Sequence, residues 1–570
     1  MSRADVMGLG PFLKALGERL DRMSKEEICR VVVQRGKAIP SVERRKFLAE
    51  FESVPPVPER SPVHDDNDLI ADIRAFVTDL EKGKYYEGTG FDPEVREYCS
   101  YGDESWVERM DGLFERAGAA FLNVNKATAA EAYGLLLHAF DMEEEDGHFC
   151  GATYATDMVA TDLNEAKARY YRALYETASA KARPALMLKE MHALRYRGSS
   201  DPSIKVVFDA ETAPPPERNV FLNGWIRLLR AQDPEEADLS MLQLSRRLLR
   251  EAVMLRDGLA GLARLAEECG AEEPAVFQEW MDELLRLDRK DEACDVARRA
   301  TAAVGDPHAK AVFAEQWATL ARSATDVLEA RRVAWRSSPT IAHLLLLYSA
   351  NAPSPEESHG RMSDESAQWR SGKVALNDGL VAVLGLLTGE YDKAATILAK
   401  SVPLGSSYGE HPGADVYPLL LLVIAAEKPM PKGCVLSLWR HELDALDRVG
   451  VSTVSGQAAT EQQPTRPTVG LWTTMEGILK RKPLTACQRE RLLDLTREVM
   501  HARVKGIVEN QQRGVYDRAA RMLVGWVEAA RFAGRVTEAD ALLEQVRRDY
   551  SRRPAFRREI EALDKCPNPT

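Results

Sequence analysis

The sequence contains no run of about 18 apolar residues, the length that a helix needs to cross a bilayer. Its most apolar stretch, 417–426, has only about half that length. The N-terminal residues also lack an apolar segment followed by a small-residue cleavage site, so no secretory signal is visible. From these absences we expect a cytoplasmic protein that does not associate with membranes.

Motifs for metal and nucleotide chemistry are missing too. The eight cysteines are scattered, which excludes a local CxxC metal or redox site. There is no GxxxxGK[ST] or GxGxxG phosphate loop. We therefore expect no catalytic residue, no cofactor and no bound metal, and a protein that is not an enzyme.

One acidic region, 141–162, keeps a metal-dependent enzyme open as an alternative. It begins DMEEEDGHFC, which brings several carboxylates close to His148 and Cys150. An EF-hand would need glycine at loop position 6 and glutamate at position 12. Counting from Asp141, glycine stands at position 7 and alanine at position 12, so that motif does not fit.

The residue composition of the chain favours helices. Hydrophobic residues make up 45% of the 570 residues, charged residues 29% and aromatic residues only 7%. Alanine, leucine, arginine and glutamate are frequent, and these residues lose little side-chain entropy in a helix. Apolar residues recur at three- and four-residue spacing, for example from Trp106 to Ala117. The sequence therefore predicts an all-α fold.

Charge is distributed unevenly along the chain. The formal net charge is −12, yet residues 480–570 contain 20 basic and 13 acidic residues, so this end carries +7 and the first 479 residues carry −19. Six arginines near the C-terminus form a candidate basic partner surface: Arg547, Arg548, Arg552, Arg553, Arg557 and Arg558. The simpler interpretation is that they pair with acidic parts of the chain or cap a final repeat with a polar face. The acidity of the whole chain argues against sequence-specific DNA binding.

Three segments, 280–300, 383–399 and 526–546, repeat one pattern. Each has an apolar helix, a tight turn, a charged residue before an alanine, and a second helix. The charged residue and alanine are Glu292–Ala293, Lys393–Ala394 and Glu538–Ala539. A small alanine lets the second helix approach the first, and Gly389 and Gly534 suit the turn before it.

This pattern resembles the tetratricopeptide helical-repeat family in degenerate form. The segments GDESWVERMDGLFERAGAAF, DLNEAKARYYRALYET and DYSRRPAFRREIEAL are also similar to the helical regions that accompany SWIM zinc fingers in bacterial proteins. The Cys-x-Cys and Cys-x-His elements of that zinc site are absent, so the resemblance extends to the scaffold and not to the metal.

Composition divides the chain into five parts: N-terminal helices over 1–52, helical pairs over 68–197, a repeat solenoid over 218–450, a flexible linker over 451–469 and a basic C-terminal helical domain over 470–570. The linker is assigned because it has almost no large apolar residue. The predicted fold is thus an all-α, tetratricopeptide-like helical solenoid with a linked C-terminal helical domain.

Repeat solenoids expose extended surfaces, so we expect a non-enzymatic scaffold or adaptor that binds another protein or peptide. A second hypothesis comes from layout alone, which resembles the accessory protein cut by the caspase-like protease of type III-E CRISPR systems. That resemblance implies a bacterial defence role, a protease complex as partner, and a C-terminal domain that binds a transcription factor. The candidate cleavage or hinge residues are Lys428, Met430, Lys432, Gln457 and Thr460.

Overall fold

The computed structural model describes residues 66–92, 97–123, 125–144, 148–150, 154–195, 201–232, 238–350, 376–400, 413–444 and 470–564, with isolated residues between 19 and 24 and between 360 and 368. The predicted linker, and nearly all of the predicted N-terminal helices, lie outside these ranges. The chain divides into two compact units, Met1–Leu265 and Ala266–Thr570. This division falls inside the range that the sequence predicts to be one solenoid.

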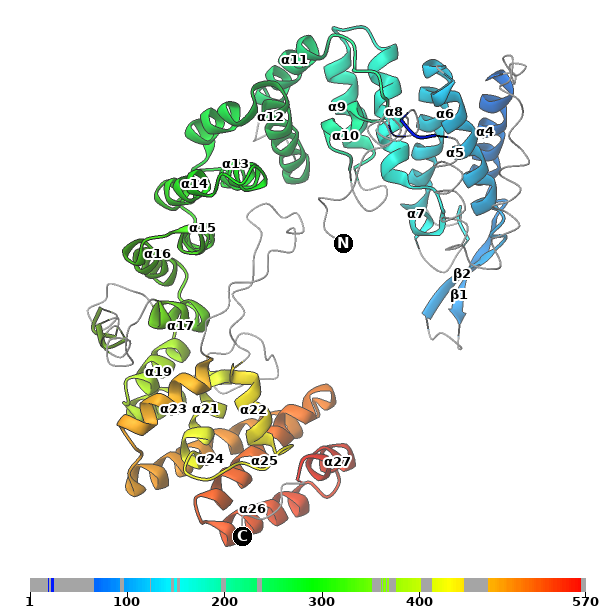
Figure 1. Cartoon of the computed structure of the whole chain (residues 1–570). Coiled ribbons are helices and arrows are strands. Elements are labelled where there is room, and N and C mark those ends of the chain that lie inside the picture. The colour runs from blue at the N-terminus through cyan, green and yellow to red at the C-terminus, as the bar shows by residue number, and fades with distance from the viewer. Residues whose placement is uncertain are drawn as a thin grey trace. The chain divides into compact units, whose positions relative to one another are not determined.

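The described residues confirm the all-α helical-repeat fold. The first unit contains α4 (Asp66–Glu81), β1 (Tyr86–Asp92), β2 (Glu97–Gly102), α5 (Trp106–Leu122), α6 (Lys126–Ala139), η2 (Phe140–Glu144), α7 (Ala155–Met158), α8 (Leu163–Thr177), α9 (Arg183–Ala193), α10 (Ile204–Phe208), α11 (Arg218–Arg230) and most of α12 (Leu239–Cys269). Helices α4, α5, α6 and α8 pack against one another (Figure 1). None of the described helices combines the length and the apolar character needed to cross a membrane.

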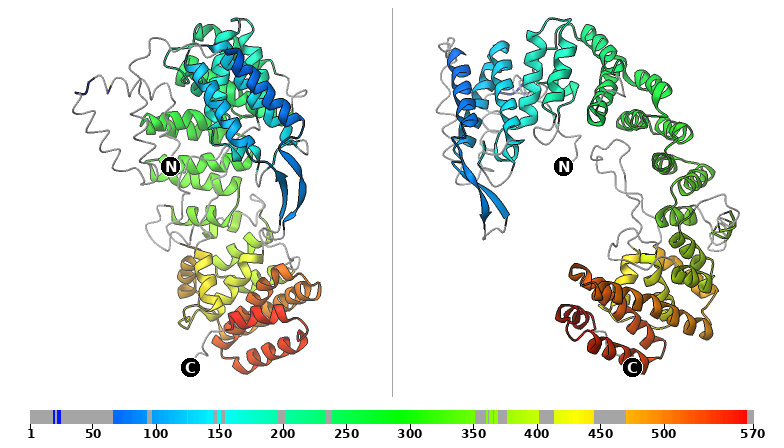
Figure 2. Two further views of the ribbon diagram at one scale, coloured as in Figure 1. Left: turned by 90° about the vertical axis from the view of Figure 1, so that its right-hand side faces the viewer. Right: turned by 180° about the vertical axis from the view of Figure 1, so that it is seen from behind.

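The sequence analysis predicts no strand, but β1 and β2 form an antiparallel hairpin that extends from the helices of the first unit (Figures 1 and 2). The two strands contain tyrosine, phenylalanine and threonine, residues that favour strands. Its base is buried, because the Tyr85 ring packs on Phe76 with 6.1 Å between centroids. Gly102 passes so close to Tyr85 that a Cβ there would lie 2.2 Å from the Tyr85 carbonyl oxygen.

The second unit contains α13 (Ala275–Arg286), α14 (Lys290–Ala303), α15 (Pro307–Leu320), α16 (Ala324–Ser337), α17 (Ile341–Ser349), α19 (Asp378–Leu387), α20 (Tyr391–Lys400), α21 (Gly413–Ala425), α22 (Val435–Asp444), α23 (Leu471–Arg481), α24 (Ala486–Glu509), η3 (Arg513–Val515), α25 (Tyr516–Phe532), α26 (Val536–Asp549) and α27 (Pro554–Leu563). From α13 to α17 each helix packs on the next. Helices α13 and α15 form one layer of this stack, and α14 and α16 form the other (Figure 1). This arrangement is a short helical solenoid.

The three repeated segments fold as the hairpins α13–α14, α19–α20 and α25–α26, and all three use one turn. The second residue after the first helix has left-handed backbone: φ is 56° at Asp288, 76° at Gly389 and 90° at Gly534. The next backbone N–H bonds to the carbonyl five residues earlier, as in Arg535 N to Ala530 O at 2.8 Å. These are Schellman turns, which end a helix by satisfying its last carbonyl groups.

The alanine of each repeat lies in the second helix, at the point where the two helices come closest. Ala293, Ala394 and Ala539 are each 0% exposed. Each alanine stands at the same distance along the chain from its left-handed residue, so the predicted equivalence holds in the structure. A larger side chain at these positions would push the helices apart.

Residues 470–564 do not form a separate domain from the helices before them. The core of the second unit runs continuously from Trp335 to Ile560 and includes α19–α22 together with α23–α27. The Trp439 ring of α22 lies on Gly525 of α25, where a Cβ would meet the ring at 2.3 Å. The linked C-terminal domain predicted at 470 is therefore packed into the solenoid's own core. Local composition missed this because the apolar partners lie about 100 residues apart in sequence.

Glu528 makes the most specific contact across this core. Its side chain is buried on α25, and its two oxygens accept hydrogen bonds from the backbone N–H groups of Val435 at 3.0 Å and Leu436 at 2.9 Å. These donors belong to the first turn of α22, whose N–H groups have no partner within the helix. Burial raises the pKa of Glu528 to about 7, although the two backbone donors act in the opposite direction.

We predict that Ala539→Leu lowers the free energy of unfolding by about 1–3 kcal/mol, because extra methyl groups do not fit between α25 and α26. Urea unfolding followed by circular dichroism measures the change. Ala541→Leu is the matched control, since Ala541 is exposed on the same helix. Equal urea midpoints for the two variants would contradict the packing explanation.

We also predict that stability falls with rising pH through Glu528. Because its pKa is raised from 4.5 to about 7, the folded state between these pH values holds a proton that the unfolded state lacks. Relative to Glu528→Gln, the wild-type chain should lose up to about 3 kcal/mol of unfolding free energy between about pH 5 and about pH 8. Urea titrations of both proteins at several pH values test this, and parallel pH profiles would refute it.

Candidate protein-binding surfaces

The six C-terminal arginines lie around the turn 550–553, which joins α26 to α27. Arg547 pairs with Asp564 at 3.0 Å and with Glu544 at 2.8 Å, and Arg557 pairs with Glu561 at 3.7 Å. Arg547 therefore ties α26 to the residue that follows α27, whereas the Arg557 pair lies within α27.

The other four arginines form no ion pair with any residue that the structure describes. Arg548, Arg552 and Arg558 are exposed, and Arg553 is half-buried. We refer to these four residues as the arginine surface. The structure thus divides the predicted cluster into two arginines that form ion pairs and four that form none with the described residues.

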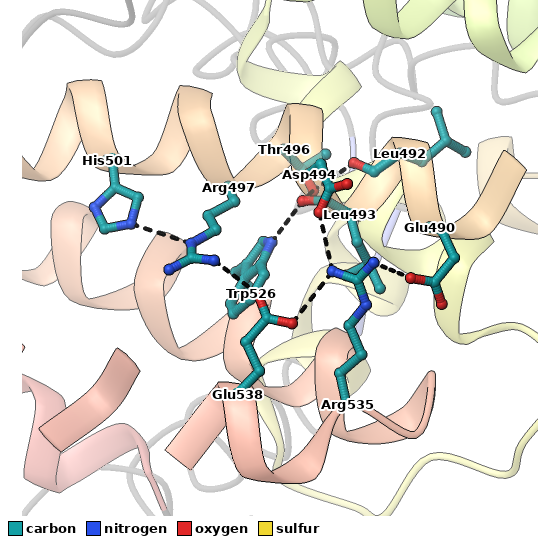
Figure 3. A network of polar contacts seen from close by, with 10 residues as sticks. All are labelled: Glu490, Leu492, Leu493, Asp494, Thr496, Arg497, His501, Trp526, Arg535 and Glu538. Carbon is teal, nitrogen blue, oxygen red and sulfur yellow. Dashed lines mark hydrogen bonds and ion pairs between the residues drawn. The ribbon is translucent and has the colours of Figure 1, made fainter. Parts of the chain in front are cut away.

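The last hairpin is itself fixed by a network of ion pairs between α24 and α26 (Figure 3). The Arg535 guanidinium, just before α26, contacts Glu490 and Asp494 of α24 and Glu538 of its own helix. Arg497 of α24 reaches the same Glu538 at 2.7 Å. Arg289 and Glu292 occupy the equivalent places in α13–α14 and also pair. The charged residue before each alanine therefore anchors the start of the second helix.

A polar ladder connects the two helices of one layer. Gln316 of α15 donates from Nε2 to Oε1 of Gln278 on α13 at 2.8 Å, and Gln278 donates to Oδ1 of Asp282 at 2.9 Å. The two glutamines are half-buried and Asp282 is exposed. On the same two helices, the rings of Phe277 and Phe313 meet edge to face with 6.2 Å between centroids. We call Gln278, Asp282 and Gln316 the polar ladder.

The loop 426–434 between α21 and α22 holds three of the predicted cleavage residues. Lys428 and Lys432 are exposed, whereas Met430 is half-buried and packs against the core. Glu427 pairs with Arg489 of α24 at 2.5 Å, which fastens the start of the loop. The other two predicted residues, Gln457 and Thr460, lie outside the described residues.

In the acidic region 141–162, the side chains described below make contacts that stabilise the fold. His148 Nδ1 lies 2.9 Å from the carbonyl oxygen of Leu80, and Asp162 accepts the Asn164 N–H at 2.9 Å as the N-cap of α8. Burial raises the pKa of the Cys150 thiol. In the part of the chain that the structure describes, no three histidine, cysteine, aspartate or glutamate side chains gather as metal ligands would.

A pocket of about 230 Å³ in the first unit is lined by residues of α5, α6 and α8, among them Asp111, Tyr133 and Arg169. Some of its charged groups already have partners. Asp111 accepts hydrogen bonds from Thr161 N and Oγ1 at 2.9 and 2.6 Å, and Arg169 pairs with Glu165 at 2.7 Å. These contacts hold the loop before α8 against α5.

The polar ladder is the feature that sequence reasoning missed. Gln278 and Gln316 are 38 residues apart, and only the stacking of α13 on α15 brings them together. No local signal distinguishes these glutamines, because both helices carry several other polar residues. A comparison with protein-family models finds no match to this chain, and a comparison with curated proteins likewise finds none.

The shared core leads to a prediction about proteolysis. A site for a sequence-specific protease placed within 451–469, once cut, should leave the two fragments associated, because α22 and α25 bury large apolar residues against each other. We expect the fragments to elute together in size-exclusion chromatography under native conditions and to separate only in denaturant. Separation without denaturant would show that the C-terminal helices are a releasable domain.

Proposed function

We propose that the protein is a non-enzymatic, helical-repeat adaptor that binds another protein, and that it resembles the tetratricopeptide repeats in function as well as in pattern. The observation that carries this proposal is the recurrence of one helical hairpin, with the same left-handed turn and the same buried alanine, at α13–α14, α19–α20 and α25–α26. Stacked hairpins of this kind place the first helix of each pair in one layer and leave its outer face open to a partner.

The polar ladder is the best candidate contact on that face. Its amide groups both donate and accept hydrogen bonds, so they suit the main chain of an extended peptide or polar side chains of a protein. The same two helices also pack through the Phe277 and Phe313 rings, so the ladder is carried on helices that are ordered before a partner binds. Half-buried groups at the centre of a contact contribute more to affinity than exposed groups at its rim.

The hypothesis of a protease-cleaved regulator finds less support. The exposed loop 426–434 is accessible at Lys428 and Lys432, but its ends are fastened by the Glu427–Arg489 pair and by the capped start of α22. A cut there or in 451–469 would leave both fragments within one core. Release of a C-terminal fragment would therefore require partial unfolding.

Affinity purification of the tagged, full-length chain from its native host tests the adaptor proposal. We expect a stoichiometric protein partner, and at least a tenfold lower yield of that partner with Asp282→Lys plus Gln316→Lys, because the added charges disrupt the polar ladder. Glu329→Lys plus Ala302→Lys is the matched control, since both residues are exposed on the other layer. Absence of a stoichiometric partner would reject the adaptor proposal. Equal yields of the partner from the polar-ladder variant and from the control variant would place the contact outside the polar ladder.

A further inference from the structure

The arginine surface keeps an excess of positive charge after the local ion pairs are counted. Residues 547–558 contain six arginines and one acidic residue, Asp549. Asp564, the acidic group that closes the last helices, is already occupied by Arg531 at 3.2 Å and Arg547 at 3.0 Å. Arg548, Arg552, Arg553 and Arg558 therefore have no described carboxylate to neutralise them.

The turn that carries these arginines is held rigidly. Phe556, in the first part of α27, is 0% exposed and meets the rings of Tyr516 and Tyr550 edge to face, each at 5.7 Å. Backbone hydrogen bonds from Ser551 N to Arg548 O and from Arg553 N to Tyr550 O close the turn. A ligand would meet arginines whose backbone is already ordered, which lowers the entropic cost of binding.

The backbone adds positive potential at the same place. Helix α27 begins at Pro554, beside Arg552 and Arg553, and no side chain caps its first N–H groups. The start of a helix carries a partial positive charge and unpaired N–H donors, both of which favour an anion. The arginine side chains and the start of α27 therefore both favour an anionic ligand.

We propose that the arginine surface binds a short, carboxylate-rich segment of a partner protein. This inference rests on the proposed adaptor function and supplies the chemistry of one partner segment. Guanidinium groups bind carboxylates through two parallel hydrogen bonds, so the three exposed arginines and Arg553 fit a run of a few acidic residues.

An acidic protein segment fits the charges better than nucleic acid does. Nucleic-acid-binding proteins commonly neutralise about 6–10 phosphates along a strand, whereas this surface offers four arginines around one turn. Glu544 and Asp549 are exposed on the same end of α26, and they would repel a phosphate chain that continued past the turn. The net charge of −12 opposes a long polyanion further.

Fluorescence anisotropy with the purified full-length chain tests this proposal directly. The probe is a fluorescein-labelled peptide of six glutamates flanked by glycines. We expect saturable binding that weakens with added salt and falls at least tenfold in Arg548→Glu plus Arg552→Glu plus Arg558→Glu. Arg548→Gln plus Arg552→Gln plus Arg558→Gln serves if the reversed charges disturb folding, as judged by circular dichroism.

The matched control is Lys181→Glu plus Arg227→Glu plus Arg299→Glu, which makes the same change in net charge at exposed residues elsewhere. Equal loss in this control would show that net charge alone governs binding and would overturn the proposal. So would an absence of peptide binding, or tighter binding of a short DNA duplex that is lost in the arginine variant. These outcomes leave the adaptor proposal standing, because its own test depends on the polar ladder and on partner capture.

Discussion

The close approach of two helices at one buried alanine is the contact on which the second unit depends. At Ala293, Ala394 and Ala539 the absence of a larger side chain lets the second helix of each hairpin lie directly on the first. The left-handed residue in the turn reverses the chain in the space of a few residues, so the two helices meet at the same place each time. The three hairpins α13–α14, α19–α20 and α25–α26 follow from repeating that contact.

The second constraint is that one core includes helices on both sides of residues 451–469, the range that the composition assigns to a linker. Glu528 binds the start of α22, and Trp439 of that helix lies on Gly525, so α25 is joined to a helix that precedes it by about 90 residues. Removing either side would expose the apolar residues of the other and leave a buried carboxylate without its donors. The C-terminal helices therefore belong to the same core as the helices before them.

Features governed by local chemistry could be predicted from the sequence, whereas features governed by distant contacts could not. Gly389 and Gly534 indicate their turns because glycine adopts a left-handed backbone without strain, but Asp288 makes the same turn and carries no such signal. The helix that begins at Trp106 is predicted from the spacing of its apolar residues. The hairpin of β1 and β2 was missed because its short aromatic segments lie beside strong helical patterns.

The same distinction explains the arginines. Their positive charge is evident in the sequence, but only folding decides that Asp564 reaches Arg531 and Arg547, and that Arg548 and Arg552 form no ion pair with the described residues. A final repeat needs a polar outer face for solubility, and a mixture of both charges would supply one. The local excess of positive charge lies on the turn before α27, whose first N–H groups no side chain caps. In a chain of net negative charge, that excess is the feature that the proposed acidic segment would recognise.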